Sequence, residues 1–250
     1  MNTFDSLKAD LVRLGIKPTD TVTMHSSMKK IGQTEGGGDT VIDVFFDYLG
    51  KDGLFVLPSH SWGNIRYYGN IYDIKRVASC LGLLPNLMLA RENVYRSLHP
   101  THSVCAFGKD AENFVDGELG ATEFVPRTGC YHKLLERGGK IMLVGVDQHS
   151  NTFLHGLETW ETDGTPSWYR DTPVYYKIKL PNGELADSHV YHTTLDTSKY
   201  FYKVMDAVLA EESTVVGKFG EADTLVMDCE KTYPILADMF RENPRMFLEE

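Results

Sequence analysis

The sequence lacks the long apolar runs and the cysteine spacing that would assign it to a membrane or to a structural zinc fold. A membrane-spanning helix needs about eighteen consecutive apolar residues, and no stretch of this chain is that long. The four cysteines form no CxxC pair and match no zinc framework, and isolated thiols are typical of a reducing compartment. The N-terminal segment mixes acids and bases, which does not predict a signal peptide. We therefore expect a cytoplasmic protein with no membrane partner.

Several common catalytic motifs are also absent. The chain has no GxSxG, so a nucleophile of the α/β-hydrolase kind is not supported. It has neither the HExxH of zinc proteases nor the GxGxxG of dinucleotide-binding domains. The P-loop spacing GxxxxGK[ST] is missing as well. The chain therefore carries none of these common sequence signatures of hydrolysis, hydride transfer and phosphoryl transfer.

Positive charge is scarce relative to negative charge. The chain holds 25 Lys and Arg against 35 Asp and Glu, a formal net charge of -10. Such a balance argues against a nucleic-acid partner, whose phosphates would be repelled. Acidic clefts concentrate cations, so a cationic ligand suits this chain better, although solvated acidic faces are the more common cause of such a charge.

The length and the order of predicted elements indicate one α/β domain over residues 1–250. A chain of 250 residues is enough for one large core. Strand-like and helix-like segments alternate through the first 150 residues, which predicts a central mixed sheet flanked by helices. Residues 160–200 differ, because prolines and Asn182-Gly183 stand between strand-like runs and predict a hairpin. We expect this segment to form a β-rich flap on the body of helices and strands.

The most informative constellation is GVDQHSNTFLHGLE at residues 145–158. A buried strand ends in glycine, and Ser150 and Asn151 are candidate N-caps of a helix that runs through Glu158. His155 and Glu158 are three residues apart and share one face of that helix. A carboxylate beside an imidazole orients the ring, as a general base requires. Judged by spacing alone, a surface pair without function is the more common cause of such a pattern.

Two other segments combine small polar side chains with basic ones. At residues 25–38, HSSMKKIG and three glycines follow a strand, where backbone amides and Lys29 can meet a pyrophosphate, although an ordinary turn gives the same pattern. At residues 96–103, RSLHPTHS precedes a buried strand, and Arg96 suits a phosphate. His99 and His102 supply only two ligands on a proline-containing turn, so we predict no metal site.

Taken in order, these three segments resemble the aminoglycoside 3-N-acetyltransferase family. That family shows a strand running into His-Ser-Ser before a glycine turn, which here is residues 24–32 with the glycines 36–38. It then shows Arg-Ser-x-His-Pro-x-x-Ser, here residues 96–103, and Gly-Val followed by Asn-Thr-x-Leu-His-x-x-Glu, here residues 145–158. Order and spacing agree over roughly residues 5–160, whereas residues 160–200 match no family pattern.

The resemblance implies transfer of acetyl from acetyl-CoA to the 3-amino group of an aminoglycoside 2-deoxystreptamine ring, without a covalent enzyme intermediate. The catalytic histidine of the family maps to His155 and its motif glutamate to Glu158. The contacts to coenzyme A map to His25, Ser26, Ser27, Lys29, Ile31, Gly32, Arg96, Ser97, His99 and Ser103. For the cationic acceptor we expect contacts from Asp147, Asn151, Glu158 and Glu161, with Asp163 nearby. The flap at residues 160–200 would then lie on the acceptor side of the site.

The sequence is also compatible with other functions. The chain could acylate another amine, such as an amino sugar or a small metabolite. It could be a metal-dependent hydrolase using His25, His99 and His102, or a silent module that binds coenzyme A. A monomer and a homodimer are both compatible with the sequence.

Overall fold

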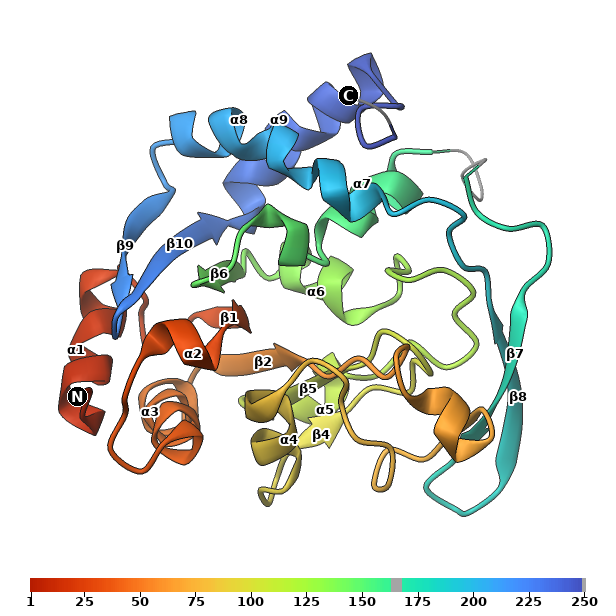
Figure 1. The fold of residues 1–250 in the computed structure, drawn as a ribbon, viewed down its shortest axis with the longest axis horizontal. Coiled ribbons are helices and arrows are strands. Elements are labelled where there is room, and N and C mark those ends of the chain that lie inside the picture. The colour runs from red at the N-terminus through yellow and green to blue at the C-terminus, as the bar shows by residue number, and fades with distance from the viewer. Residues whose placement is uncertain (163–167, 249–250) are drawn as a thin grey trace.

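A computed structural model describes residues 1–162 and 168–248 and has at its centre a mixed seven-stranded sheet of order β4-β5-β2-β1-β6-β10-β9 (Figure 1). The three central strands β2, β1 and β6 are parallel, and the outer strands run antiparallel to their neighbours. The predicted α/β class with a mixed sheet is confirmed. The strands are β1 (Thr21–Ser26), β2 (Leu54–Pro58), β4 (Tyr95–Arg96), β5 (Val104–Gly108), β6 (Lys140–Val144), β9 (Val215–Phe219) and β10 (Ala222–Asp228).

Helices cover both faces of this sheet, because its strands carry apolar side chains on both sides. On one face, Leu11, Phe45 and Met88 pack with Phe55. On the other, Leu157 belongs to a second core with the opposite side chains of the same strands. The first face carries α1 (Phe4–Arg13), α3 (Gly38–Leu49) and α4 (Leu83–Leu89), and the second carries α6 (Cys130–Glu136), α7 (Leu154–Trp160) and α9 (Cys229–Glu242).

The remaining helices are short. They are α2 (Met28–Ile31), α5 (Ala111–Phe114), α8 (Met205–Ala210) and the 3₁₀ helices η1 (Ile65–Tyr68), η2 (Gln148–Ser150) and η3 (Thr197–Val204). Within residues 1–162 and 168–248, no helix is long and apolar enough to cross a bilayer. The helix expected from Ser150 or Asn151 begins later, at Leu154, because Gln148–Ser150 form a separate 3₁₀ turn.

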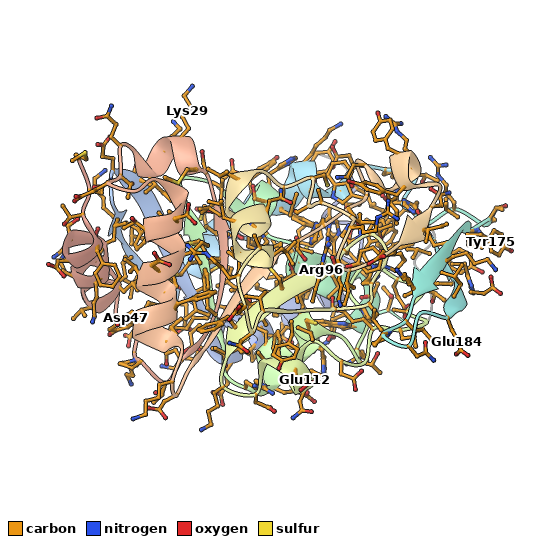
Figure 2. All side chains as sticks on the ribbon, turned by 90° about the horizontal axis from the view of Figure 1, so that it is seen from below. Lys29, Asp47, Arg96, Glu112, Tyr175 and Glu184 are labelled. Atoms are coloured by element: carbon orange, nitrogen blue, oxygen red, sulfur yellow. The ribbon has the colours of Figure 1, made fainter. Side chains whose placement is uncertain are left out.

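A separate three-stranded sheet forms the predicted β-rich flap. It consists of β3 (Ile71–Tyr72), β7 (Val174–Lys179) and β8 (Leu185–Val190) in the order β3-β7-β8, at the right of Figure 1. The expected Asn-Gly turn joins β7 to β8, and Gly183 has φ +89°, which favours glycine. Tyr176 and Ile178 face the core, whereas Tyr175 projects outward with Glu184 at the outer end of Figure 2.

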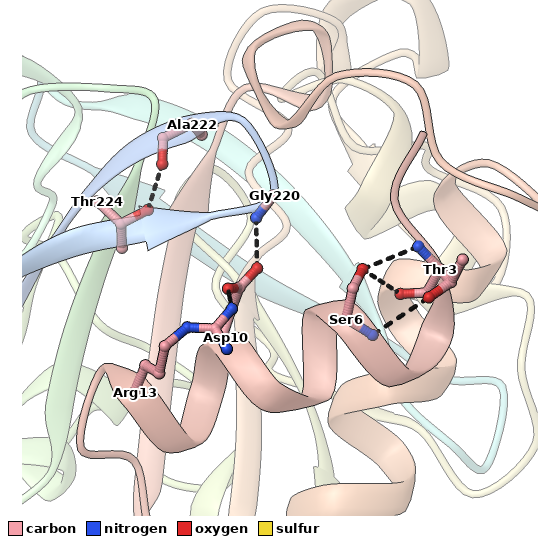
Figure 3. Close-up of polar contacts among 7 residues, drawn as sticks. All are labelled: Thr3, Ser6, Asp10, Arg13, Gly220, Ala222 and Thr224. Atoms are coloured by element: carbon pink, nitrogen blue, oxygen red, sulfur yellow. Dashed lines mark hydrogen bonds and ion pairs between the residues drawn. The ribbon is translucent and has the colours of Figure 1, made fainter.

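The N-terminal helix is tied to the far edge of the central sheet (Figure 3). Thr3 and Ser6 form a reciprocal capping box that begins α1. Asp10, which is 7% exposed, accepts a hydrogen bond of 2.9 Å from the backbone N–H of Gly220 in the β9–β10 turn. Arg13 pairs with the same carboxylate. These contacts join two segments that lie more than 200 positions apart in the chain.

Candidate active site

A cleft of about 720 Å³ opens where β1 and β2 end and where the chain leaves β6. This is the place where ligands bind in open α/β sheets, beyond the carboxyl ends of parallel strands. Its other wall is the segment that leads into η3. The lining is rich in imidazoles and hydroxyls, and it consists of Met24, His25, Ser26, Leu57, Pro58, His60, Trp62, Leu81, Pro85, His102, Phe124, Val146, His149, Ser150, Thr152, His155 and residues 192–198.

The predicted histidine and glutamate meet at this cleft. His155 and Glu158 lie one turn apart on α7, and His155 Nδ1 is 2.5 Å from Glu158 Oε2. The Glu158 side chain is 0% exposed, while that of His155 is 16% exposed and lines the cleft. A carboxylate can only accept, so Nδ1 carries the proton and the Nε2 lone pair is left for a substrate. The pair therefore has the tautomer that a general base needs.

Aromatic rings hold the His155 imidazole in place. Phe201 contacts it edge to face with ring centroids 5.0 Å apart, and Phe124 does so at 5.7 Å. The ring of His102 stacks on Phe124 at 4.1 Å and lies 6.5 Å from His155. His60 in turn lies 4.7 Å from His102. His25, His60 and His102, at or next to the ends of β1, β2 and β5, thus line the same cleft as His155.

Burial keeps four histidines of the cleft lining, His25, His60, His102 and His192, neutral. Burial lowers the pKa of His25 to about 3. Burial, with a smaller contribution from neighbouring imidazoles, lowers the pKa values of His60 and His102 well below the ordinary value. Burial also lowers the pKa of His192, helped by the charge of Arg170. These four imidazoles therefore offer uncharged donors and acceptors to the cleft.

The first segment expected to contact coenzyme A is only partly at the cleft. His25 and Ser26 line it, and Ser27 lies just beyond, where its backbone N–H donates to the Val144 carbonyl at 2.9 Å. Lys29 projects into solvent from α2 (Figure 2). Ile31 is a core residue, and Gly32 has φ +89° with Glu221 so close that a side chain would collide with it. The last two residues therefore shape the turn.

Arg96 is a buried structural residue. It is 6% exposed and lies within the body of the molecule (Figure 2). Its Nε donates to the hydroxyls of Ser59 and Ser103, each at 3.2 Å. Its terminal nitrogens donate to the carbonyls of Ser59, Val77 and Ile74. Protein acceptors therefore occupy all three nitrogens, and the side chain does not line the cleft around His155.

The rest of that segment is also buried in protein contacts. The Ser97 hydroxyl accepts from the Val104 N–H at 3.0 Å, and the Ser103 hydroxyl donates to the Ser59 carbonyl at 2.9 Å. His99 uses both ring nitrogens within the chain, so it has none for a metal. Among residues 1–162 and 168–248, no group of three or more His, Cys, Asp or Glu is placed to hold a metal ion.

The expected acceptor residues do not gather in the cleft, apart from Glu158 behind His155. Asp147 is exposed and caps η2 by accepting from the His149 N–H. Asn151 is buried and donates to Gln148 Oε1 at 2.8 Å. Glu161 pairs with Arg241 at 2.7 Å and accepts from the Tyr233 hydroxyl. Asp163 lies outside the described residues.

Sequence reasoning missed a whole wall of the cleft. Residues 192–198 (His-Thr-Thr-Leu-Asp-Thr-Ser) line the cleft together with the strand ends and carry four hydroxyls and the carboxylate of Asp196. Trp62 and Phe124 were missed too, and His102 was considered only as a metal ligand. No motif marks these positions. The available signal was weaker: an unusual density of hydroxyls after the predicted hairpin and of aromatic residues after Pro58.

Comparison with known proteins assigns the family. The family model described as aminoglycoside 3-N-acetyltransferase matches residues 23–241. The SPbeta prophage-derived aminoglycoside N(3')-acetyltransferase-like protein YokD of Bacillus subtilis (strain 168) is 29% identical over 244 residues, which cover 88% of this chain and 86% of that protein.

Solved structures share the fold. AAC-IIIb in a binary complex with CoASH superposes with a TM-score of 0.81 at 21% identity, over 96% of each chain. A variant of the aminoglycoside acetyltransferase AAC(3)-IVa, in complex with a gentamicin, superposes with a TM-score of 0.83 at 23% identity, over 100% of this chain and 92% of that chain. Since the family model spans most of the sequence, and the cleft with its His–Glu pair lies inside the matched region, this chain belongs to the aminoglycoside 3-N-acetyltransferase family.

Proposed function

We propose that this protein transfers an acetyl group from acetyl-CoA to the 3-amino group of an aminoglycoside 2-deoxystreptamine ring. The observation that carries the proposal is the His155–Glu158 pair, 2.5 Å apart at the wall of the cleft. Family relatives bound to CoASH and to a gentamicin support this choice of donor and acceptor.

In the proposed mechanism the amine attacks the thioester carbon directly. His155 Nε2 takes the proton of the attacking nitrogen as the new C–N bond forms. The C–S bond then breaks, and the departing thiolate receives the proton from the imidazolium. Glu158 holds Nδ1–H throughout and stabilises the transient positive charge on the ring. No acetyl group passes to the protein at any step.

The two substrates would enter from different sides. Ser26, at the end of β1, and Lys29, exposed on the next helix, are the groups offered to coenzyme A, with Lys29 near its phosphates. The acceptor would lie against residues 192–198, where hydroxyls suit a sugar or aminocyclitol and Asp196 suits an ammonium. In this proposal the reacting carbon lies beside His155. Arg96 has no direct role in it.

The variant His155→Ala tests the base. Release of free thiol from acetyl-CoA is followed with gentamicin, sisomicin and glucosamine as acceptors. We expect kcat to fall by about 10²–10⁴-fold, because the amine proton has no acceptor, while acetyl-CoA still binds. His189→Ala is the matched control, since His189 lies on β8 and does not line the cleft. Near-normal turnover by His155→Ala would remove His155 from the mechanism.

The direct attack has a separate kinetic test. If the amine attacks the bound thioester, initial rates at varied concentrations of both substrates give intersecting lines, because both must be bound before product leaves. Parallel lines, or an acetylated protein detected by mass spectrometry after mixing with acetyl-CoA alone, would show a covalent intermediate and refute direct attack.

A second candidate acceptor is an amine with fewer charges, such as a simple amino sugar or small metabolite. The observation that favours it is electrostatic: of the described residues that line the cleft, only Asp196 carries a carboxylate. A polycationic aminoglycoside gains most from several carboxylates. Higher kcat/KM for glucosamine than for gentamicin would favour this candidate, and the reverse order would favour the first.

A further inference from the structure

His102 lines the cleft, and a protein contact holds only one of its two ring nitrogens. It lies just before β5 and is 8% exposed. Its Nδ1 is 2.9 Å from the Thr101 hydroxyl. Among the described residues, none forms a hydrogen bond with its Nε2 atom, and the side chain lines the same cleft as His155. The two rings are 6.5 Å apart and nearly perpendicular, at 78°.

A chain of hydrogen bonds decides which nitrogen of His102 carries the proton. His99 Nε2 lies 2.8 Å from the Glu123 carbonyl, which can only accept, so His99 is protonated there. Its Nδ1 is then an acceptor, and it receives the backbone N–H groups of Thr101 at 3.2 Å and of His102 at 2.9 Å. One lone pair that already serves two donors has little capacity for a third.

The Thr101 hydroxyl therefore donates its hydrogen bond to His102. Its distance to His99 Nδ1 is 3.4 Å, whereas its distance to His102 Nδ1 is 2.9 Å. When the hydroxyl donates to Nδ1, a neutral imidazole must carry its proton on Nε2. The ring is neutral, because burial and the neighbouring His60 keep the pKa of His102 well below its ordinary value. Glu123, His99 and Thr101 thus leave the proton of His102 on Nε2, the ring nitrogen that no described residue occupies, in a side chain that lines the cleft.

We propose that His102 Nε2–H is the donor that stabilises the oxyanion formed when the amine attacks the thioester carbonyl. The inference rests on the proposed acetyl transfer and adds a catalytic residue to it. The ring centroids are 6.5 Å apart, so both imidazoles lie close enough to serve one reacting centre, with His155 meeting the attacking nitrogen and His102 the carbonyl oxygen. The proton of the amine goes to His155, the oxyanion is held by His102, and collapse expels the thiolate.

A neutral imidazole suits this role in the described site. It donates one directed hydrogen bond, and it does not compete with His155 for the proton of the amine. Phe124 stacks on His102 at 4.1 Å and fixes the plane of its ring. The donor is thus oriented before substrate binds, which is the condition for strong stabilisation of a developing charge.

The infrared stretch of the thioester carbonyl gives a direct test without any acceptor. Acetyl-CoA labelled with ¹³C at the carbonyl is bound to the wild type, to His102→Gln and to His102→Leu. We expect the stretch to lie at a lower frequency in the wild type than in His102→Leu, because only the former donates a hydrogen bond. His102→Gln retains an amide donor at similar reach and should restore most of the shift. The same frequency in all three proteins would overturn the proposal.

Steady-state kinetics provide a second test. We expect His102→Leu to lower kcat by about 10²–10³-fold with little change in the KM for acetyl-CoA, and His102→Gln to recover much of that loss. Thr101→Val frees Nδ1 and should lower kcat by about tenfold or less, with Thr101→Ser restoring it. ¹⁵N spectra of the ring nitrogens should show an Nε2–H tautomer in the wild type and its partial loss in Thr101→Val. An Nδ1–H tautomer in the wild type would also overturn the proposal.

The outcomes separate this inference from the function on which it rests. If the wild type turns over no amine, the proposed acetyl transfer fails, and the carbonyl frequency still decides whether His102 donates to a bound thioester. If amines are acetylated but the carbonyl frequency ignores His102, the transferase stands and the His102 proposal falls. Unfolding in urea verifies that each variant is folded under the assay conditions.

Discussion

Single side chains at this site take their roles from burial as much as from chemical type. Arg96 and His155 both stand in family motifs, but Arg96 is enclosed by carbonyls and hydroxyls, whereas His155 keeps one nitrogen at the cleft. Arg96 also lies 5.1 Å from the ring of Tyr72, a cation–π contact that helps to compensate for its burial. Its donors link the strand ends at Ser59 and Ser103 to the loop before α4.

Arg96→Lys should therefore act on stability. A lysine cannot reproduce the donors of the guanidinium fork, so at least one hydrogen bond from a charged group is lost, at a cost of about 1.5–3 kcal/mol in the free energy of unfolding. Urea unfolding measures this. The KM for acetyl-CoA of the folded variant should stay near that of the wild type. Unchanged stability with a raised KM would instead assign Arg96 to a phosphate of the coenzyme.

Trp62 offers an optical probe of the cleft. It is 54% exposed, whereas Trp160 and Trp168 are 3% and 8% exposed, so a soluble quencher reaches mainly Trp62. We expect saturating gentamicin to reduce acrylamide quenching in the wild type, because a ring stacked on the indole excludes the quencher. Trp62→Phe should lose this response. Unchanged quenching on addition of gentamicin would place the acceptor away from Trp62.

At the scale of elements, α1 depends on a contact with the opposite end of the chain. The buried carboxylate of Asp10 joins it to the β9–β10 turn (Figure 3). Asp10→Ala leaves the Gly220 N–H without this acceptor and should lower the free energy of unfolding by about 1–3 kcal/mol. Asp5 is exposed in the first turn of the same helix, so Asp5→Ala should lower the free energy of unfolding by only about 0.3 kcal/mol. Equal effects of both variants in urea unfolding would contradict this account of the tie.

At the scale of the whole molecule, the buried histidines make stability depend on mildly acidic pH. His25, His60, His99 and His102 have folded-state pKa values below the ordinary 6.5 because they are buried. The unfolded chain therefore binds more protons than the folded one below pH 6.5, so stability is intact above that pH and falls as the pH decreases. Each such histidine contributes a slope of up to about 1.4 kcal/mol per pH unit.

Urea titrations at several pH values measure this slope. We expect little change in the unfolding midpoint between pH 8 and pH 7 and a steep decline from pH 6.5 to pH 5. His60→Gln removes one of the four groups and should make the decline shallower. Identical unfolding midpoints of the wild type at pH 7.5 and pH 5.5 would refute this account of the pH dependence. The acids whose pKa values are lowered by ion pairs, such as Asp73 beside Lys179, lose their contribution only at lower pH.

The sequence alone predicted the features that depend on local order. Periodicity indicated the α/β class, Asn-Gly indicated the β7–β8 hairpin, and the spacing of His155 and Glu158 put them on one helix face. Short strands escaped because they carry too little pattern: β3 and β4 have two residues each. The resemblance to one family came from three segments whose order and spacing can be read along a single sequence.

Tertiary structure decided which of the motif residues face the cleft. His25, His60 and His102 meet because the strands β1, β2 and β5 are neighbours in the sheet, an order that no local pattern encodes. The same packing buries Arg96 and brings residues 192–198 into the lining of the same cleft. Local hydrogen bonding and periodicity act over a few residues and can be read along the chain. Burial and convergence arise from contacts between distant segments, so they appear only in the folded molecule.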